Sequence, residues 1–198
     1  MQFDNAPATY ALIFANLAAS LYAFFVDRNF INQFAFNVGA VVKKEQHYRV
    51  ITSSFLHVDF FHLFINMLTL FIFGPVVERI LGKLGFLVVY FGSIIASGVV
   101  SSITQRKNPD YSSVGASDAV SGVVLSFCLF FPLHPIYFMF LPIGIPAIIY
   151  GVAFIFLSAR MMGRPGGRIA HEGHLGGALA GVVLTILMKP EVITRFFG

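Results

Sequence analysis

Six long apolar stretches alternate with short polar segments along this chain, and the alternation predicts an all-α, polytopic membrane protein. Each stretch is close to the roughly 20 residues that a helix needs to cross a bilayer, about twice the length of a barrel strand. In lipid the backbone polar groups must pair within the segment, which favours helices. The predicted bundle of six transmembrane helices covers residues 8–26, 55–76, 84–103, 115–133, 137–158 and 171–189.

The polar segments between these helices differ in length. The first, from about Asp27 to Thr52, is long enough to form structure of its own at the membrane surface. Four prolines predict a tight turn after the fourth helix and an irregular start to the fifth. They are Pro132, Pro135, Pro142 and Pro146. No internal repeat divides the chain, which predicts a single membrane domain over residues 1–198.

Composition agrees with the membrane interpretation. The chain is 57% hydrophobic and 11% charged, against roughly 25% charged in soluble domains. Its formal charge of +4 includes no basic block, so we expect the lipid bilayer and no nucleic acid as a partner. The single cysteine, Cys128, lies in an apolar run and excludes an internal disulfide.

Basic side chains are distributed unevenly between the two sides of the predicted bundle. With six helices both termini share one side, where about four Lys and Arg residues lie, against about nine in the loops of the other side. Cytoplasmic loops usually carry the excess of Lys and Arg. The count alone therefore places the longer loops in the cytoplasm.

Two of the predicted helices open with residues suited to nucleophilic catalysis. Gly115 can adopt a turn that other residues disfavour, and Ser117 then lies at a helix N-terminus, where unpaired amides favour a developing oxyanion. The sixth helix opens with His171 and His174, one turn apart. A base that activates a serine must reach it by a hydrogen bond. By itself Ser117 is a weak signal and is more typical of an ordinary helix cap or of a small residue packed between membrane helices.

Small residues offer a way to bring these two helices together. Gly177 and Gly181 form a narrow face on the sixth helix, and the fourth helix has a similarly slim surface around Gly122. Close contact between the two faces would bring His174 within hydrogen-bond reach of Ser117.

The second predicted helix carries two polar side chains on one face. His62 and Asn66 are four residues apart and offer two hydrogen-bond donors near one end of the span. Such side chains are costly in lipid and usually line a cavity or the bundle interior, although hydrogen bonding between helices is an alternative role. His57, just before them, is expected to support the site, for example by retaining water.

The order and spacing of these motifs resemble the rhomboid family of intramembrane serine proteases, in the six-helix bacterial-type arrangement. The resemblance covers nearly the whole chain. It rests on His62-x-x-x-Asn66, Gly115-x-Ser117, His174-x-x-Gly177-x-x-x-Gly181, Tyr48-Arg49 in the first loop and Glu78-Arg79 at the end of the second helix.

The resemblance implies a Ser117–His174 dyad that cleaves transmembrane helices of single-spanning membrane proteins without a cofactor or metal. The oxyanion would be held by the backbone N–H of Ser117 with the side chains of His62 and Asn66. It also implies a multi-pass protein of the bacterial inner (plasma) membrane whose active site opens to the extracytoplasmic side. That orientation is opposite to the one the basic residues indicate.

One residue departs from the family pattern, which usually has glycine after the catalytic serine. Asp118 occupies this position, and a carboxylate about 5 Å from an oxyanion would repel it by roughly 3 kcal/mol at an effective dielectric near 20, about two decades in rate. Asp118 could instead point to water or sit against His174 as imidazolium. The alternative function is a rhomboid-like pseudoprotease that binds membrane clients.

Other uses of the histidines are less well supported. His171, beside Glu172, is expected to support the helix start rather than the chemistry. Its i, i+3 spacing from His174 is not the His-Glu-x-x-His pattern of zinc proteases, which disfavours a metal site built with His57 and His62. Haem ligation is disfavoured because the histidines cluster at one membrane face beside a serine motif.

Overall fold

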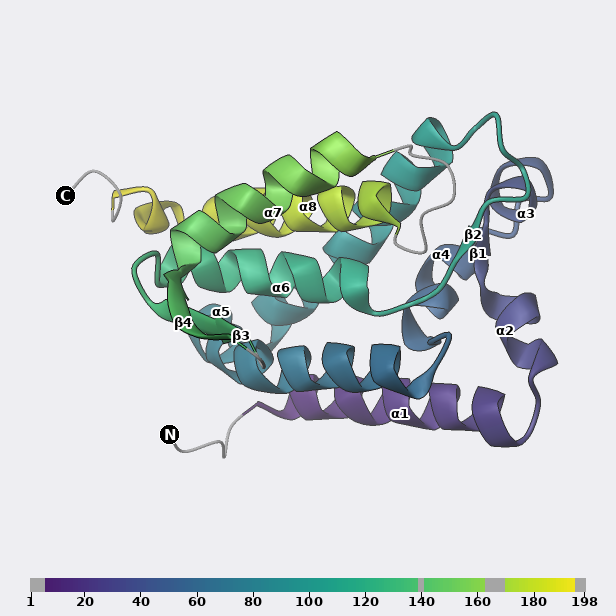
Figure 1. Cartoon of the computed structure of the whole chain (residues 1–198), viewed down its shortest axis with the longest axis horizontal. Helices are drawn as coiled ribbons and strands as arrows, with labels where there is room; N and C mark the ends of the chain where they lie inside the picture. Colours follow the sequence, from purple (N-terminus) through teal and green to yellow (C-terminus); the bar gives the residue numbers. More distant parts are fainter. Residues whose placement is uncertain (1–5, 139–140, 163–169, 195–198) are drawn as a thin grey trace.

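The computed structural model describes residues 6–138, 141–162 and 170–194, and it is predominantly helical (Figure 1). Helix α1 begins and helix α8 ends at the same end of the bundle. Residues 163–169, which include two of the basic residues counted above, lie outside the described part. The long helices are α1 (Pro7–Phe25), α5 (Phe60–Thr104), α6 (Ser117–Phe130), α7 (Ala147–Met161) and α8 (His171–Met188), and a short 3-10 turn, η2 (Pro190–Val192), follows α8.

The second and third predicted helices lie in one element, α5. Gly82 interrupts it with φ 72°, a conformation that glycine adopts readily, and the chain reverses direction there (Figure 1). Helices α1 and α5 are long and apolar enough to be candidate membrane spans. Because α5 has 45 residues and one crossing needs about 20, the turn at Gly82 divides it into two span-length halves, 60–81 and 83–104.

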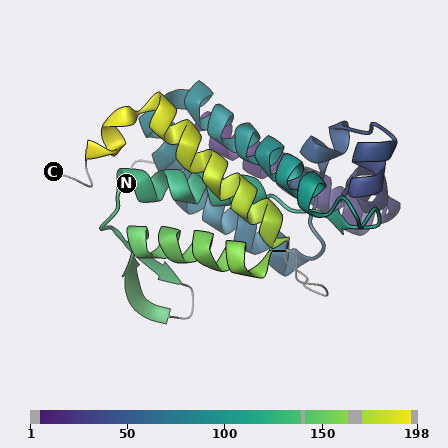
Figure 2. The same ribbon diagram turned by 90° about the horizontal axis from the view of Figure 1, so that it is seen from above.

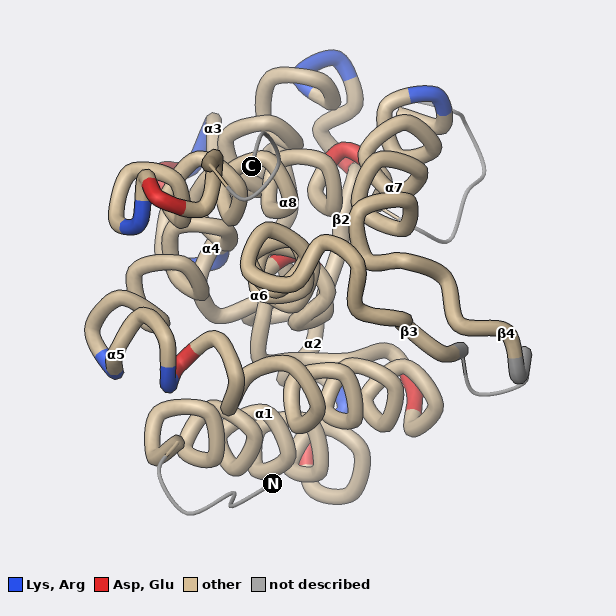
Figure 3. The backbone as a smooth tube through the Cα atoms, turned by 90° about the vertical axis from the view of Figure 1, so that its left-hand side faces the viewer, with Lys and Arg blue, Asp and Glu red and all other residues tan. Residues whose placement is uncertain are grey.

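Helix α6 occupies the centre of the bundle. Ten consecutive residues from Ala119 to Cys128 are buried, and α5, α7 and α8 surround them (Figure 3). On the outside of the bundle large apolar side chains such as Phe14, Leu84 and Leu187 are exposed. The Lys, Arg, Asp and Glu residues of the described part lie in loops, near helix ends or near the turn at Gly82 in α5. An apolar surface of this extent is suited to contact with lipid.

The structure corrects the fifth predicted helix, 137–158. Helix α7 begins only at Ala147, and the residues before it form an antiparallel hairpin of β3 (Pro135–Phe138) and β4 (Leu141–Pro146). Proline lacks the amide that a helix interior requires and is tolerated at the ends and edges of strands, which explains the difference. The hairpin projects from the bundle near the end where α8 finishes (Figure 2).

The long first loop is structured, as the sequence predicts. It contains α2 (Asn29–Phe34), β1 (Phe36–Asn37), α3 (Val38–Lys43), α4 (Tyr48–Thr52) and a 3-10 turn, η1 (Ser53–Phe55). The Arg49 guanidinium holds it together by donating to the backbone carbonyls of Asn32 and Ala35, both at 2.9 Å. Strand β1 pairs with β2 (Ser112–Ser113), so this loop braces the segment that leads into α6.

A buried carboxylate joins α1 to the first half of α5. Glu78 accepts hydrogen bonds from the backbone amides of Ala8 (2.9 Å) and Thr9 (2.8 Å) and from the Thr9 hydroxyl (2.7 Å). The first amides of a helix have no partner within the helix, so Glu78 supplies acceptors that α1 itself lacks. The contact fixes one end of α1 against α5.

We expect Glu78→Ala to lower the free energy of unfolding by about 3 kcal/mol, because buried donors then lose a carboxylate acceptor. Reversible unfolding in detergent micelles measures the change. Glu191→Ala removes the same charge from a half-exposed side chain and is the matched control, expected to change stability by less than about 0.5 kcal/mol. Equal stability of the two variants would contradict the capping role.

Candidate active site

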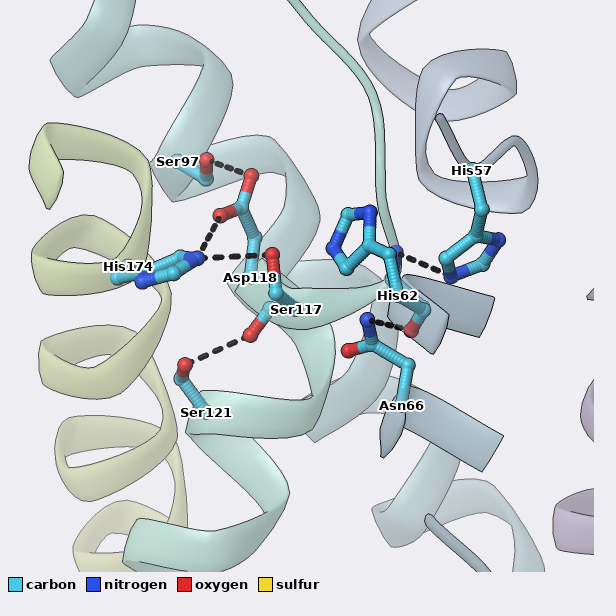
Figure 4. Close-up of polar contacts among 9 residues, drawn as sticks. His57, His62, Asn66, Ser97, Ser117, Asp118, Ser121 and His174 are labelled. Atoms are coloured by element: carbon cyan, nitrogen blue, oxygen red, sulfur yellow. Dashed lines mark hydrogen bonds and ion pairs between the residues drawn. The ribbon is translucent and has the colours of Figure 1, made fainter. Parts of the chain in front are cut away.

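The first turns of α6 and α8 bring a serine and a histidine together. Ser117 is the first residue of α6, and its Oγ lies 2.8 Å from Nε2 of His174, in the first turn of α8 (Figure 4). The His174 ring stacks on Phe154 of α7, with ring centroids 6.2 Å apart and planes 23° apart. The predicted proximity of Ser117 and His174 is therefore present in the fold.

Backbone contact between α6 and α8 sets this distance. A Cβ on Gly177 would lie 2.1 Å from the carbonyl oxygen of Asp118, and one on Gly181 would lie 2.3 Å from that of Gly122. Real Cβ atoms do not approach oxygen so closely, so these positions require glycine for the observed packing. The narrow glycine face predicted from the sequence is the surface on which the two helices meet.

The turn before Ser117 depends on a third glycine. Gly115 has φ 140°, a conformation that disfavours other residues, and its amide donates to the carbonyl of Ser53 at 3.0 Å. A Cβ there would lie 2.6 Å from Cε1 of His62, so glycine also lets the His62 ring approach the turn. The backbone N–H of Ser117 then lies in the first turn of α6, where no carbonyl of the same helix can accept it.

His62 and Asn66 lie across Ser117 from His174 (Figure 4). Both belong to the first turns of α5, which Asp59 caps by accepting from the His62 amide at 2.8 Å. One N–H of the Asn66 side-chain amide donates a hydrogen bond to the backbone carbonyl of His62 at 2.9 Å, and its second N–H is left as a further donor. Two side chains with donor capacity therefore face the serine from the side opposite the histidine.

His57 is fully buried behind this group and contacts both α1 and the turn before α6. It accepts the Ala116 amide at Nε2 (3.4 Å), and its Nδ1 lies 2.9 Å from Oγ of Ser20. Burial, aided by the neighbouring His62, lowers the pKa of His57 to about 3, so the ring is neutral. With Nε2 accepting, Nδ1 carries the proton and donates it to Ser20.

His171 and Glu172 occupy the start of α8 without touching Ser117. The His171 ring is 6.3 Å from that of His174, centroid to centroid, and the buried Glu172 carboxylate accepts from the Gln105 side chain at 2.6 Å. Within the described residues, no three or more His, Cys, Asp or Glu side chains are grouped so that they could hold a metal ion.

Sequence reasoning missed several neighbours of the predicted site, in particular Ser97 and Phe154. Ser97 donates a hydrogen bond to the carboxylate of Asp118, and Phe154 supports the His174 ring. Ser97 lies in the second half of α5, and a polar side chain inside an apolar helix is a signal that could have identified it. Phe154 is one of 24 phenylalanines in the chain and carries no such signal.

Comparison with known proteins adds independent information. The family model of the Rhomboid domain matches residues 44–191. The chain is 41% identical over 88 residues to the putative rhomboid protease YdcA of Bacillus subtilis (strain 168), covering 44% of this chain and 42% of that protein. It is 27% identical over 190 residues to the rhomboid protease GluP of the same organism, covering 90% of this chain and 34% of that protein.

Similarity extends to a mitochondrial protein. Rhomboid protein 1, mitochondrial, of Saccharomyces cerevisiae (strain ATCC 204508 / S288c) is 33% identical over 138 residues, covering 68% of this chain and 40% of that protein. These alignments span 34% to 42% of the lengths of the three proteins.

Proposed function

This chain belongs to the rhomboid family of integral membrane proteins, and on that premise we propose that it is an intramembrane serine endopeptidase working through a Ser117–His174 dyad. The observation that carries the proposal is the 2.8 Å contact between Ser117 Oγ and His174 Nε2 at the N-terminus of α6. A serine becomes a nucleophile when an adjacent base accepts its proton.

In the proposed reaction Ser117 Oγ attacks the scissile carbonyl while its proton passes to His174 Nε2. The tetrahedral oxyanion is held by the Ser117 amide and by donors from His62 and Asn66, which lie across the serine from the base. His174 then returns the proton to the leaving amine, and water hydrolyses the acyl-enzyme by the same route. Gly115 and His57 act as supports of the turn that carries Ser117.

We propose six membrane crossings, by α1, the two halves of α5, α6, α7 and α8. Helix α6 has only 14 residues, fewer than one crossing needs, so non-helical backbone at its two ends lies within the membrane. The helices around α6 shield that backbone from hydrocarbon. The substrates are the helices of single-spanning membrane proteins. The proposed location is a bacterial inner membrane with the site on the outer side, which is supported by similarity to two Bacillus proteins and opposed by the basic-residue count.

A client-binding pseudoprotease is the second candidate, and the observation that favours it is Asp118 in the place of the usual glycine. The two functions differ in one measurable respect. The pseudoprotease would hold a membrane substrate without cutting it, and its serine would show no enhanced reactivity.

A fluorophosphonate probe tests the proposed function directly. We expect the probe to modify Ser117 of the purified protein in detergent, with the adduct located by peptide mass spectrometry, because the adjacent base raises the reactivity of this hydroxyl. His174→Ala should abolish labelling while leaving the helical content unchanged. Labelling of Ser117 that is equally fast in His174→Ala, or none in wild type, would exclude the dyad.

A further inference from the structure

The carboxylate of Asp118 is turned toward the base and away from the oxyanion site. Its Oδ1 lies 4.0 Å from Nε2 of His174, and both side chains are 19% exposed. Figure 4 shows Asp118 and His174 on one side of Ser117, with His62 and Asn66 on the other. The negative charge is therefore placed where the proposed reaction develops a positive one.

A hydrogen bond from α5 holds this orientation, and a glycine on α8 leaves the space for it. Ser97 of α5 donates its hydroxyl to Oδ2 of Asp118. On α8, a Cβ at Gly173 would lie 2.8 Å from both Asp118 Oδ1 and Ser97 Oγ, so the missing side chain leaves the room that the pair occupies. The other buried carboxylate at this end, Glu172, is bound by Gln105. Ser97 therefore holds the Asp118 carboxylate in the space that Gly173 leaves open.

We propose that Asp118 is a positioning residue of the proposed protease, whose carboxylate, oriented by Ser97, stabilises the imidazolium form of His174 during catalysis. The inference rests on the proposed function and deepens it. As the Ser117 Oγ–C bond forms, the hydroxyl proton moves to His174 Nε2 and the carbonyl electron pair moves to the oxygen. Asp118 accepts no proton and remains an anion beside the ring until His174 passes its proton to the leaving amine.

The timing of the charges decides which kinetic constant is affected. In the proposed resting state the Ser117 hydroxyl donates a hydrogen bond to Nε2 of a neutral His174 ring, across the 2.8 Å contact. A neutral ring gains little from Asp118. The attraction becomes large only when the ring is charged, and an interaction made only in the transition state raises kcat rather than lowering KM. The oxyanion is held by its own donors on the far side of Ser117, so Asp118 opposes it less than the sequence alone suggests.

The test compares wild type with Asp118→Asn in proteoliposomes that contain a single-spanning substrate. Asparagine keeps the shape and still accepts the Ser97 hydroxyl but carries no charge. We expect kcat to fall about tenfold and KM to stay within about twofold. Asp110→Asn makes the same change in an exposed loop and should leave both constants unaltered. A kcat equal to or above wild type in Asp118→Asn or Asp118→Gly would overturn the inference.

A second variant keeps the inference testable if Asp118→Asn does not fold. Ser97→Ala keeps the Asp118 carboxylate but removes the hydroxyl that orients it, so kcat should fall severalfold. Ser97→Thr keeps a hydroxyl at this position and should have a kcat close to wild type. An unchanged kcat in folded Ser97→Ala counts against the positioning. If wild type cleaves the substrate and Ser117→Ala does not, the proposed protease function stands, and unchanged kcat in the Asp118 and Ser97 variants rejects only the role of Asp118. If wild type neither cleaves the substrate nor is labelled by the fluorophosphonate, both the proposed function and the role of Asp118 are rejected.

Discussion

Ser117→Ala is expected to abolish cleavage of a reconstituted single-spanning substrate, with kcat reduced at least about 10⁴-fold. The reason is that alanine leaves no atom to form the acyl-enzyme, and His174 then has no hydroxyl to activate within its 2.8 Å contact. His174→Ala should cost a similar factor. Residues that act as a unit are not additive, so the double variant should be no slower than either single one. Gel analysis of the two cleavage products measures these rates.

The matched control for this prediction is Ser126→Ala in the same helix. The Ser126 hydroxyl contacts Thr185 at 2.6 Å and the Gly122 carbonyl at 2.9 Å, and it touches neither Ser117 nor His174. We expect this variant to lose about 1 kcal/mol of stability but to keep most of its activity. Cleavage by Ser117→Ala at the wild-type rate would refute the proposed mechanism.

Gly177→Ala is expected to reduce both stability and activity. Its Cβ would lie 2.1 Å from the backbone oxygen of Asp118, so α6 and α8 must move apart. Overpacking of this kind costs typically about 2 kcal/mol, and a 1 Å displacement between catalytic groups costs about 100-fold in rate. Unfolding in micelles and turnover in proteoliposomes measure the two effects separately.

Gly92→Ala is the control for the helix-packing prediction. It adds the same methyl group to α5, but the new Cβ meets only the end of the flexible Leu184 side chain, 2.5 Å away. That side chain can change rotamer, and alanine favours helix, so we expect a stability change within about 1 kcal/mol and normal turnover. If Gly177→Ala behaved like this control, the backbone contact would not set the geometry of the dyad.

The sequence predicted the site more completely than it predicted the elements around it. Gly177 and Gly181 indicated a close approach of two helices, and the structure has Ser117 and His174 in hydrogen-bond contact where these helices meet. Short spacings of this kind are readable because they depend on one helix at a time. The catalytic roles of these residues stay predictions.

The missed features depend on contacts between distant residues. The prolines of the run 137–146 indicate an irregular start to the fifth helix, but the hairpin itself depends on the pairing of β3 with β4, which no local pattern shows. Ser97 and Asp118 are 21 residues apart, and no spacing rule connects them. The Asp118 carboxylate lies toward His174, with Oδ1 4.0 Å from Nε2, and this orientation cannot be read from the position of Asp118 beside the serine.

The cap that Glu78 forms on α1 also bears on the order in which the protein assembles. The backbone amides of Ala8 and Thr9 donate to the carboxylate of Glu78, which lies 70 and 69 positions later in the chain. During synthesis α1 therefore leaves the ribosome well before its acceptor, and its first turn must rely on water or lipid headgroups until then. Docking of α1 against α5 through this cap can therefore follow only after the first half of α5 has been synthesised.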